Sequence, residues 1–172
     1  YGDHRDLHLS IRRQRQMCIR DRIYTDLLEM SPEIEAELKV IRVDIDTLLA
    51  ESDFVSLHVP LTELTHHLID EVALKKMKAG GTLINCARGP VVSEVALIAA
   101  LKSGHIGGAG LDVFEEEPPA APNLFADFAN VVLTPHHAPG TRDTMIVKFK
   151  EIFANADRFF NGERMENEIS LI

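Results

Sequence analysis

The chain has 172 residues, of which 45% are hydrophobic, and this is enough for one domain with a buried core. Its formal net charge of −9 argues against nucleic acid as a main partner, because phosphate binding needs a basic surface. The two cysteines, Cys18 and Cys86, are too few for a disulfide framework. No apolar stretch is long enough to span a membrane, and the N-terminal residues show no signal-peptide core. We therefore expect a cytoplasmic protein with no membrane partner.

Residues 1–21 differ from the rest of the chain. The run from Arg12 to Arg22 is basic and has the periodicity of neither a helix nor a strand. Such a run is usually a solvated arm and sometimes a nucleic-acid or membrane patch. It also resembles a translated sequencing adapter, and we favour this interpretation. We therefore expect residues 1–21 to be an artefactual segment that says nothing about function.

From Arg22 onward, short apolar runs alternate with helical patterns. The runs predict strands over 22–25, 54–59, 82–87, 106–113 and 131–134. The intervening patterns predict helices over 33–39, 46–51, 70–77, 93–102 and 141–161. This alternation is typical of an α/β protein with a doubly wound, Rossmann-like parallel sheet and flanking helices. Right-handed crossovers would place the ends of all these strands on one edge.

The last predicted helix has the clearest pattern. Apolar side chains recur at helical spacing at Ile146, Phe149, Ile152, Phe153, Ala156, Phe159 and Phe160. We expect these side chains to belong to the core and not to a cofactor site.

Three chemically active side chains follow three successive predicted strands: Arg88, Glu117 and His136. Ligands bind at this edge in open α/β sheets. An arginine fork suits a carboxylate, and a histidine oriented by a neighbouring carboxylate can transfer a proton near neutral pH. Taken singly, each has an ordinary reading: a surface arginine capping a loop, a solvated acidic turn and a plain loop histidine.

Four stretches carry a resemblance to a known family, in the family's order: DFVSLHVPL at 53–61, NCARG at 85–89, GLDVFEEEP at 110–118 and NVVLTPH at 130–136. From Arg22 to the C-terminus the chain resembles the D-isomer-specific 2-hydroxyacid dehydrogenases. The resemblance implies reversible hydride transfer between NAD(H) and a small 2-hydroxy/2-oxo acid. It further implies that His136 is the acid/base, that Glu117, which precedes Pro118, holds it, and that Arg88 binds the substrate carboxylate and carbonyl.

The resemblance also implies a set of cofactor contacts. Asp26 matches the acid that accepts hydrogen bonds from ribose, which favours NAD over the phosphorylated cofactor, and Asp112 is similar to a residue near the nicotinamide amide. The other matching positions are Val59, Cys86, Ala87, Arg88, His136, His137, Ala138 and Pro139. We read Cys86 as a small apolar residue inside a strand, since no dedicated base accompanies it. The family often has glycine or alanine where Ala138 and Pro139 stand.

No metal site is expected. Two pairs of histidines are adjacent in sequence, His66–His67 and His136–His137, but adjacent side chains diverge. No acidic or cysteine partner stands at the spacing of metal ligands.

One family feature is missing. The glycine-rich phosphate loop should precede Asp26 by about 20 residues, yet no glycine lies between Gly2 and Gly80. We therefore expect residues 22–172 to form an incomplete NAD-binding domain with a C-terminal helix. Loss of the central strand would leave a gap of about 10 Å, which the alternating residues 7–11 could partly fill.

Several functions remain open from the sequence. The intact Arg88, Glu117 and His136 set favours an oxidoreductase, which the resemblance implies is a homodimer when intact. The alternatives are a non-catalytic NAD(H)-sensing scaffold and an inactive fragment. The missing loop makes the isolated chain doubtful as a catalyst.

Overall fold

The structure is a computed structural model that describes residues 22–137 and 140–167. These residues fall into two compact units. The first, which we call the sheet unit, contains Arg22–Met30 and the chain from Val40 onward through the last strand. The second, the helical unit, contains Ser31–Lys39 and the C-terminal helix.

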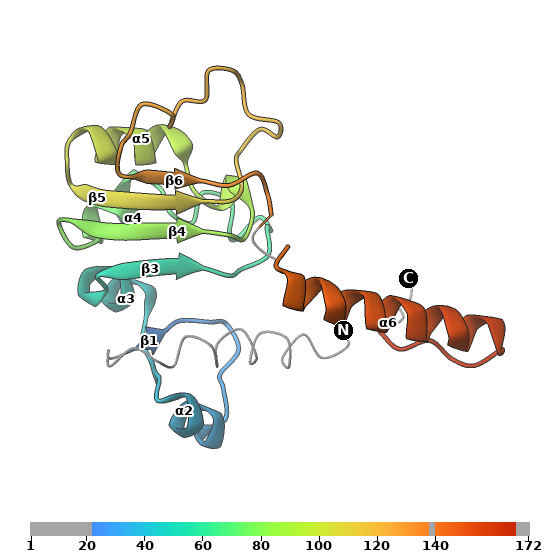
Figure 1. Cartoon of the computed structure of the whole chain (residues 1–172). Coiled ribbons are helices and arrows are strands. Elements are labelled where there is room, and N and C mark those ends of the chain that lie inside the picture. Colours follow the sequence, from blue (N-terminus) through green and yellow to red (C-terminus); the bar gives the residue numbers. More distant parts are fainter. Residues whose placement is uncertain (1–21, 138–139, 168–172) are drawn as a thin grey trace. The chain divides into compact units, whose positions relative to one another are not determined.

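The sheet unit contains six strands, all in parallel pairings (Figure 1). The strands are β1 (Ile23–Tyr24), β2 (Ile41–Arg42), β3 (Phe54–Leu57), β4 (Gly81–Asn85), β5 (Ile106–Leu111) and β6 (Val131–Leu133). The pair β1–β2 forms one sheet, and β3–β4–β5–β6 form another in chain order. The predicted Rossmann-like α/β class is confirmed. Because the four strands are parallel, the carboxyl ends of β4, β5 and β6 share one edge.

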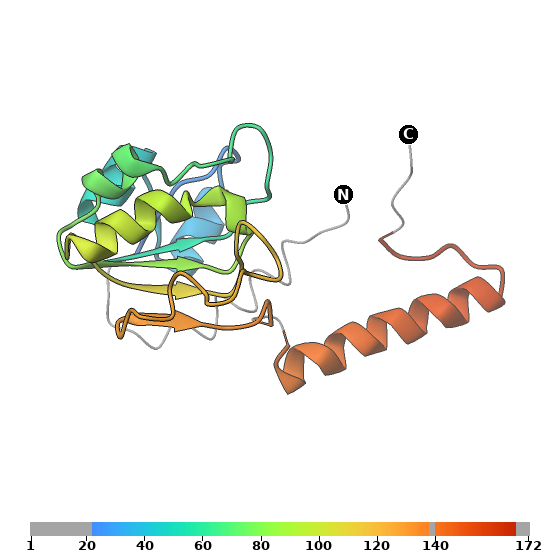
Figure 2. The same ribbon diagram turned by 90° about the horizontal axis from the view of Figure 1, so that it is seen from above.

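Three helices lie side by side on one face of the four-stranded sheet (Figure 2). They are α3 (Ile45–Glu51), α4 (Glu71–Lys76) and α5 (Glu94–Lys102). Each begins at a residue whose side chain accepts a hydrogen bond from the first helical turn: Asp44, Asp70 and Ser93. The core between helices and sheet is apolar, with Leu83, Leu97 and Ile106 fully buried.

The helical unit contains α2 (Pro32–Leu38), capped by Ser31, and α6 (Arg142–Phe160), capped by Thr141. The prediction that the apolar stripe of α6 is core is wrong. No residue of α6 is buried, and Phe153 and Phe160 are 65% and 84% exposed. Helical spacing identifies an amphipathic helix, but burial also needs a complementary surface.

The predicted elements agree with the observed ones to within about two residues, as expected for element ends. Two elements were not predicted: β2, whose two residues are exposed, and the 3₁₀ turn η2 (Gly89–Val91). The placement of Cys86 inside a strand is wrong, because β4 ends at Asn85 and Cys86 is exposed. The Asn85 side chain bonds the backbone of the following residues and turns the chain out of the sheet.

The separation of β1–β2 from β3–β6 within the described residues is what loss of a central strand predicts. The proposed filling strand at 7–11 and the whole of residues 1–21 lie outside the described residues. Over the described ranges, we find no helix with the length and apolar character needed to cross a membrane.

Candidate active site

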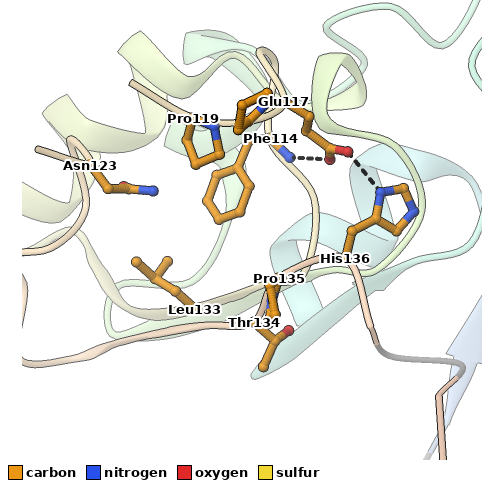
Figure 3. Close-up of a pocket in the computed structure, with 9 residues that line it drawn as sticks. Phe114, Glu117, Pro119, Asn123, Leu133, Thr134, Pro135 and His136 are labelled. Atoms are coloured by element: carbon orange, nitrogen blue, oxygen red, sulfur yellow. Dashed lines mark hydrogen bonds and ion pairs between the residues drawn. The ribbon is translucent and has the colours of Figure 1, made fainter. Parts of the chain in front are cut away.

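A histidine and a glutamate from two loops meet at the edge formed by the ends of β5 and β6 (Figure 3). Nδ1 of His136 lies 2.7 Å from Oε2 of Glu117, and the N–H of Phe114 donates to Oε1 of Glu117 at 3.0 Å. The hydrogen bond with His136, followed by that from Phe114, holds the pKa of Glu117 below its usual value. An ionised carboxylate therefore orients the imidazole through Nδ1 and leaves Nε2 for a ligand.

The backbone at His136 is held in an uncommon conformation. Its φ of 52° lies in the left-handed region, which costs a non-glycine residue about 1 kcal/mol or more. The carboxylate of Asp112, only 2% exposed, fixes the chain on both sides. Its Oδ1 accepts from Oγ1 of Thr134 at 2.5 Å and from the N–H of His137 at 2.7 Å. Asp112 thus positions the turn that carries His136, and its predicted contact with the cofactor stays a prediction.

Arg88 lies three residues past the end of β4 and is exposed, as a substrate-binding arginine needs to be. The buried side chain of Asn85 brackets it: Oδ1 accepts from the N–H of Ala87 and Nδ2 donates to the carbonyl of Arg88, both at 3.0 Å. Nη1 of Arg88 donates to the Ala87 carbonyl at 2.6 Å. Within the described residues, the other guanidinium donors make no hydrogen bond, which suits a carboxylate ligand.

Gly89 lets the turn after Arg88 pack directly on the loop that carries Glu117. A Cβ at this position would lie 1.8 Å from the carbonyl oxygen of Phe114, closer than any side chain permits. The two turns are therefore in backbone contact. No hydrogen bond or ion pair among the described residues joins Arg88 to Glu117 or His136, so the three lie on neighbouring strand ends without a closed network.

A cavity of about 400 Å³ lies beside the histidine (Figure 3). Glu117 and His136 lie at one end of it, and Pro119, Asn123 and Leu133 at the other. Its walls are mostly apolar and consist of Phe114, Glu117, Pro118, Pro119, Asn123, Leu133, Thr134, Pro135 and His136.

The remaining predicted cofactor residues differ in their surroundings. Asp26 is exposed just past β1, and its Oδ1 accepts from the N–H of Leu28 at 3.1 Å. Val59 is half-buried, Ala87 is buried, and Cys86 and His137 are exposed. Ala138 and Pro139 lie outside the described residues. An exposed acid and the turns around Arg88 and His136 suit the ribose and nicotinamide of NAD, but the described residues contain no glycine-rich turn for its pyrophosphate.

Asn85, Gly89 and Thr134 were given no role from the sequence, although they hold the site together. An asparagine in an apolar run just before an arginine is a signal that could have been used. The roles of Gly89 and Thr134 depend on loops that meet only after folding. In the described ranges, no group of three His, Cys, Asp or Glu side chains could hold a metal ion.

Comparison with known proteins then settles the family. Residues 15–138 match the family model described as "D-isomer specific 2-hydroxyacid dehydrogenase, NAD binding domain". The chain belongs to this family. The resemblance seen in the four motifs is confirmed, and the matching family model is that of an NAD-binding domain, as the predicted cofactor requires.

Individual dehydrogenases of the family show how much of such a protein the chain represents. It is 49% identical over 139 residues to the glyoxylate reductase of Thermococcus litoralis, covering 81% of this chain and 42% of that protein. The apo form of Rhodotorula graminis D-mandelate dehydrogenase superposes with a TM-score of 0.82 at 38% identity, covering 94% of this chain and 48% of that one. D-lactate dehydrogenase with NAD+ from Lactobacillus jensenii gives a TM-score of 0.80 at 32% identity, covering 87% and 48%. The chain spans less than half the length of each.

Proposed function

We propose that this chain is the NAD-binding part of an NAD-dependent D-2-hydroxyacid dehydrogenase, which interconverts a 2-hydroxy acid and the corresponding 2-oxo acid. The observation that carries the proposal is the hydrogen bond between His136 and Glu117, next to the turn that carries Arg88. A carboxylate-oriented histidine beside an exposed arginine is what reduction of a 2-oxo acid needs: a proton donor and a carboxylate anchor.

Each residue has one task in this reaction. The guanidinium of Arg88 pairs with the substrate carboxylate and polarises the neighbouring carbonyl. In the reductive direction, Nε2 of His136 gives its proton to the oxygen of the developing alkoxide, and in the oxidative direction it takes that proton back. Glu117 keeps the ring oriented and balances the positive charge of the imidazolium. The nicotinamide supplies the hydride when it is bound.

Binding of NADH to the purified chain tests the cofactor part of the proposal. Fluorescence titration is expected to give a dissociation constant in the micromolar range, supported by Asp26 on the ribose hydroxyls. If no binding is detected at millimolar NADH, the chain alone does not bind the cofactor, and the function belongs to a longer protein that contains this sequence.

Turnover with a panel of 2-oxo acids tests the catalytic part. His136→Ala is expected to lower kcat by about 10²–10⁴-fold, because it removes the proton donor. His66→Ala, which removes an exposed histidine outside the site, serves as the matched control. Equal activity of the two variants would contradict the assignment of His136 as acid/base.

We also propose a homodimeric, cytoplasmic protein in which residues 22–172 are the family portion and residues 1–21 are foreign to it. The four family motifs, all of which follow Arg22, and the cysteine content support this, whereas the match to the family model begins earlier, at residue 15. Light scattering of the intact protein is expected to give twice the mass of one of its own chains. Deletion of residues 1–21 is expected to leave NADH affinity unchanged, and a loss of affinity would show that they belong to the domain.

A further inference from the structure

A second set of contacts joins the start of α5 to the turn that carries Glu117. Oε1 of Glu94 accepts a hydrogen bond from the N–H of Glu115, and Oε1 of Glu115 accepts one from the N–H of Glu94, both at 2.8 Å. The side chain of each residue therefore binds the backbone of the other, and we call this reciprocal pair of Glu94 and Glu115 the clamp. The clamp ties the helix to the middle of the turn.

A histidine extends the clamp toward Arg88. Nε2 of His67 lies 3.3 Å from Oε1 of Glu115, and the N–H of His67 donates to the carbonyl of Pro90 at 2.8 Å. Pro90 belongs to η2, the turn that follows Arg88. The clamp is thus connected to both turns that carry the proposed catalytic groups.

Glu94 is not needed to start the helix. Ser93 already caps α5, since its Oγ accepts from the N–H of Ala96 at 3.4 Å. Burial raises the pKa of Glu94, and the nearby charge of Glu115 acts in the same direction, against the effect of the hydrogen bond that Glu94 accepts. Partial burial of the Glu94 carboxylate is unfavourable because the charged group loses contact with water. The hydrogen bond that this carboxylate accepts comes from the turn, from the N–H of Glu115.

We propose that Glu94 is a positioning residue that holds Glu117 against His136 through this turn. Glu94 binds the N–H of Glu115, and the preceding N–H, that of Phe114, binds Glu117 (Figure 3). The N–H of Glu115 thus holds the turn to α5, and the neighbouring N–H of Phe114 holds the carboxylate of Glu117 to the same turn. The catalytic meaning of this role rests on the function proposed for Glu117; the geometric role does not.

The test measures the side-chain carboxyl of Glu117 by carbon-13 NMR titration of the whole chain. In Glu94→Ala, the turn loses its anchor and the titration midpoint of Glu117 is expected to move up toward the ordinary value for glutamate. Removal of the negative charge of Glu94 alone would move this midpoint down. Glu94→Gln keeps the acceptor oxygen but loses the charge, so the midpoint is expected to stay in place or to move slightly down, and not up. Glu71→Ala, at the equivalent first position of α4, is the matched control.

Each outcome decides the proposal. An unchanged Glu117 midpoint in Glu94→Ala would overturn it, and so would an equal shift in Glu71→Ala or in Glu94→Gln. Where Glu94→Ala does not fold, Glu94→Asp keeps the charge but shortens the reach, and it is expected to shift the midpoint in the same direction; no shift there would overturn the proposal. The titration needs no cofactor or substrate. Failure of the proposed function would therefore appear in NADH binding or turnover while the midpoints behave as expected.

Discussion

The two ends of the sheet unit present ligand-facing edges that are built very differently. The turns carrying Arg88, Glu117 and His136, for which we propose catalytic roles, are called the catalytic edge. The β1–β2 pair with the loop after β1, which carries the proposed ribose ligand Asp26, is called the ribose edge. At the catalytic edge, the buried side chains of Asn85 and Asp112 hold the backbone of neighbouring turns. At the ribose edge, Asp26 is exposed, and its Oδ1 accepts from Leu28 only two residues away.

This difference shows which of the two edges has its binding geometry fixed by the protein before a ligand arrives. The catalytic edge is fixed by contacts between segments far apart in sequence, so its geometry precedes ligand binding. The ribose edge consists of β1–β2, two residues each, and exposed side chains such as the ion-paired Arg42 and Glu29. We expect changes at the catalytic edge to alter stability as well as chemistry, and changes at the ribose edge to alter ligand binding alone.

The largest effect is expected from Gly89→Ala. The added methyl group would overlap the backbone of Phe114, so the two catalytic turns must separate. We expect a loss of more than about 3 kcal/mol in the free energy of unfolding, measured by urea denaturation. Gly110→Ala is the control: its Cβ meets Ile84 at an ordinary 3.9 Å, and stability should change by less than about 1 kcal/mol. Similar losses in both would mean that the close contact is not the cause.

A smaller loss is expected from Asp112→Ala. It removes the acceptor of Thr134 Oγ1 and of the His137 N–H and is expected to cost roughly 2–3 kcal/mol in the free energy of unfolding. Asp112→Asn keeps one acceptor oxygen and should retain most of this stability. If the alanine variant is as stable as the parent chain, Asp112 does not position the catalytic turn.

Asp26→Ala tests the ribose edge. We expect the free energy of unfolding to change by less than about 0.5 kcal/mol, because the side chain is exposed. The dissociation constant for NADH is expected to rise by about 10-fold through loss of hydrogen bonds from the ribose hydroxyls. Glu51→Ala, which removes an exposed acid at the end of α3, is the control and is expected to leave NADH binding unchanged. A large loss of stability in Asp26→Ala would remove the contrast between the two edges.

The smallest effect concerns pH. The lowered pKa of Glu117 means that its ionised form stabilises the folded chain above the ordinary pKa of glutamate. This contribution is lost as the pH falls through the lowered value. The difference in unfolding free energy between the parent chain and Glu117→Gln should therefore shrink on acidification, and it should be small throughout because the pair is partly exposed. A difference that grows toward low pH would contradict the sign.

The sequence predicted the elements well where periodicity is strong or turn residues are distinctive. The strands β3–β6 and the helices α3–α5 follow the expected order, and the expected contact of Glu117 with His136 is present. The two-residue strand β2 escaped prediction, since so short and exposed a pair has no alternating pattern. Burial of the α6 stripe was predicted wrongly because spacing reveals an apolar face but not what covers it.

Within the site, the candidate side chains could be identified from the sequence, but the residues that support them could not. Arg88, Glu117 and His136 stand out by residue type and by their place after strands. The need for Gly89, in contrast, arises from a loop 25 residues further along the chain, since its obstacle is the backbone of Phe114. The reciprocal pairing of Glu94 with Glu115 is likewise invisible until the helix and the turn meet.

The backbone contact at Gly89 has a consequence for motion. Two loops that touch without an intervening side chain cannot slide past each other by changing rotamers, so the segments bearing Arg88 and Glu117 move as one rigid body. Any hinge that opens or closes the site must lie outside this pair of loops. The backbone spacing between the turn bearing Arg88 and the loop bearing Glu117 is then expected to change little in such a cycle, so adaptation to ligands of different size falls to side chains or to segments elsewhere.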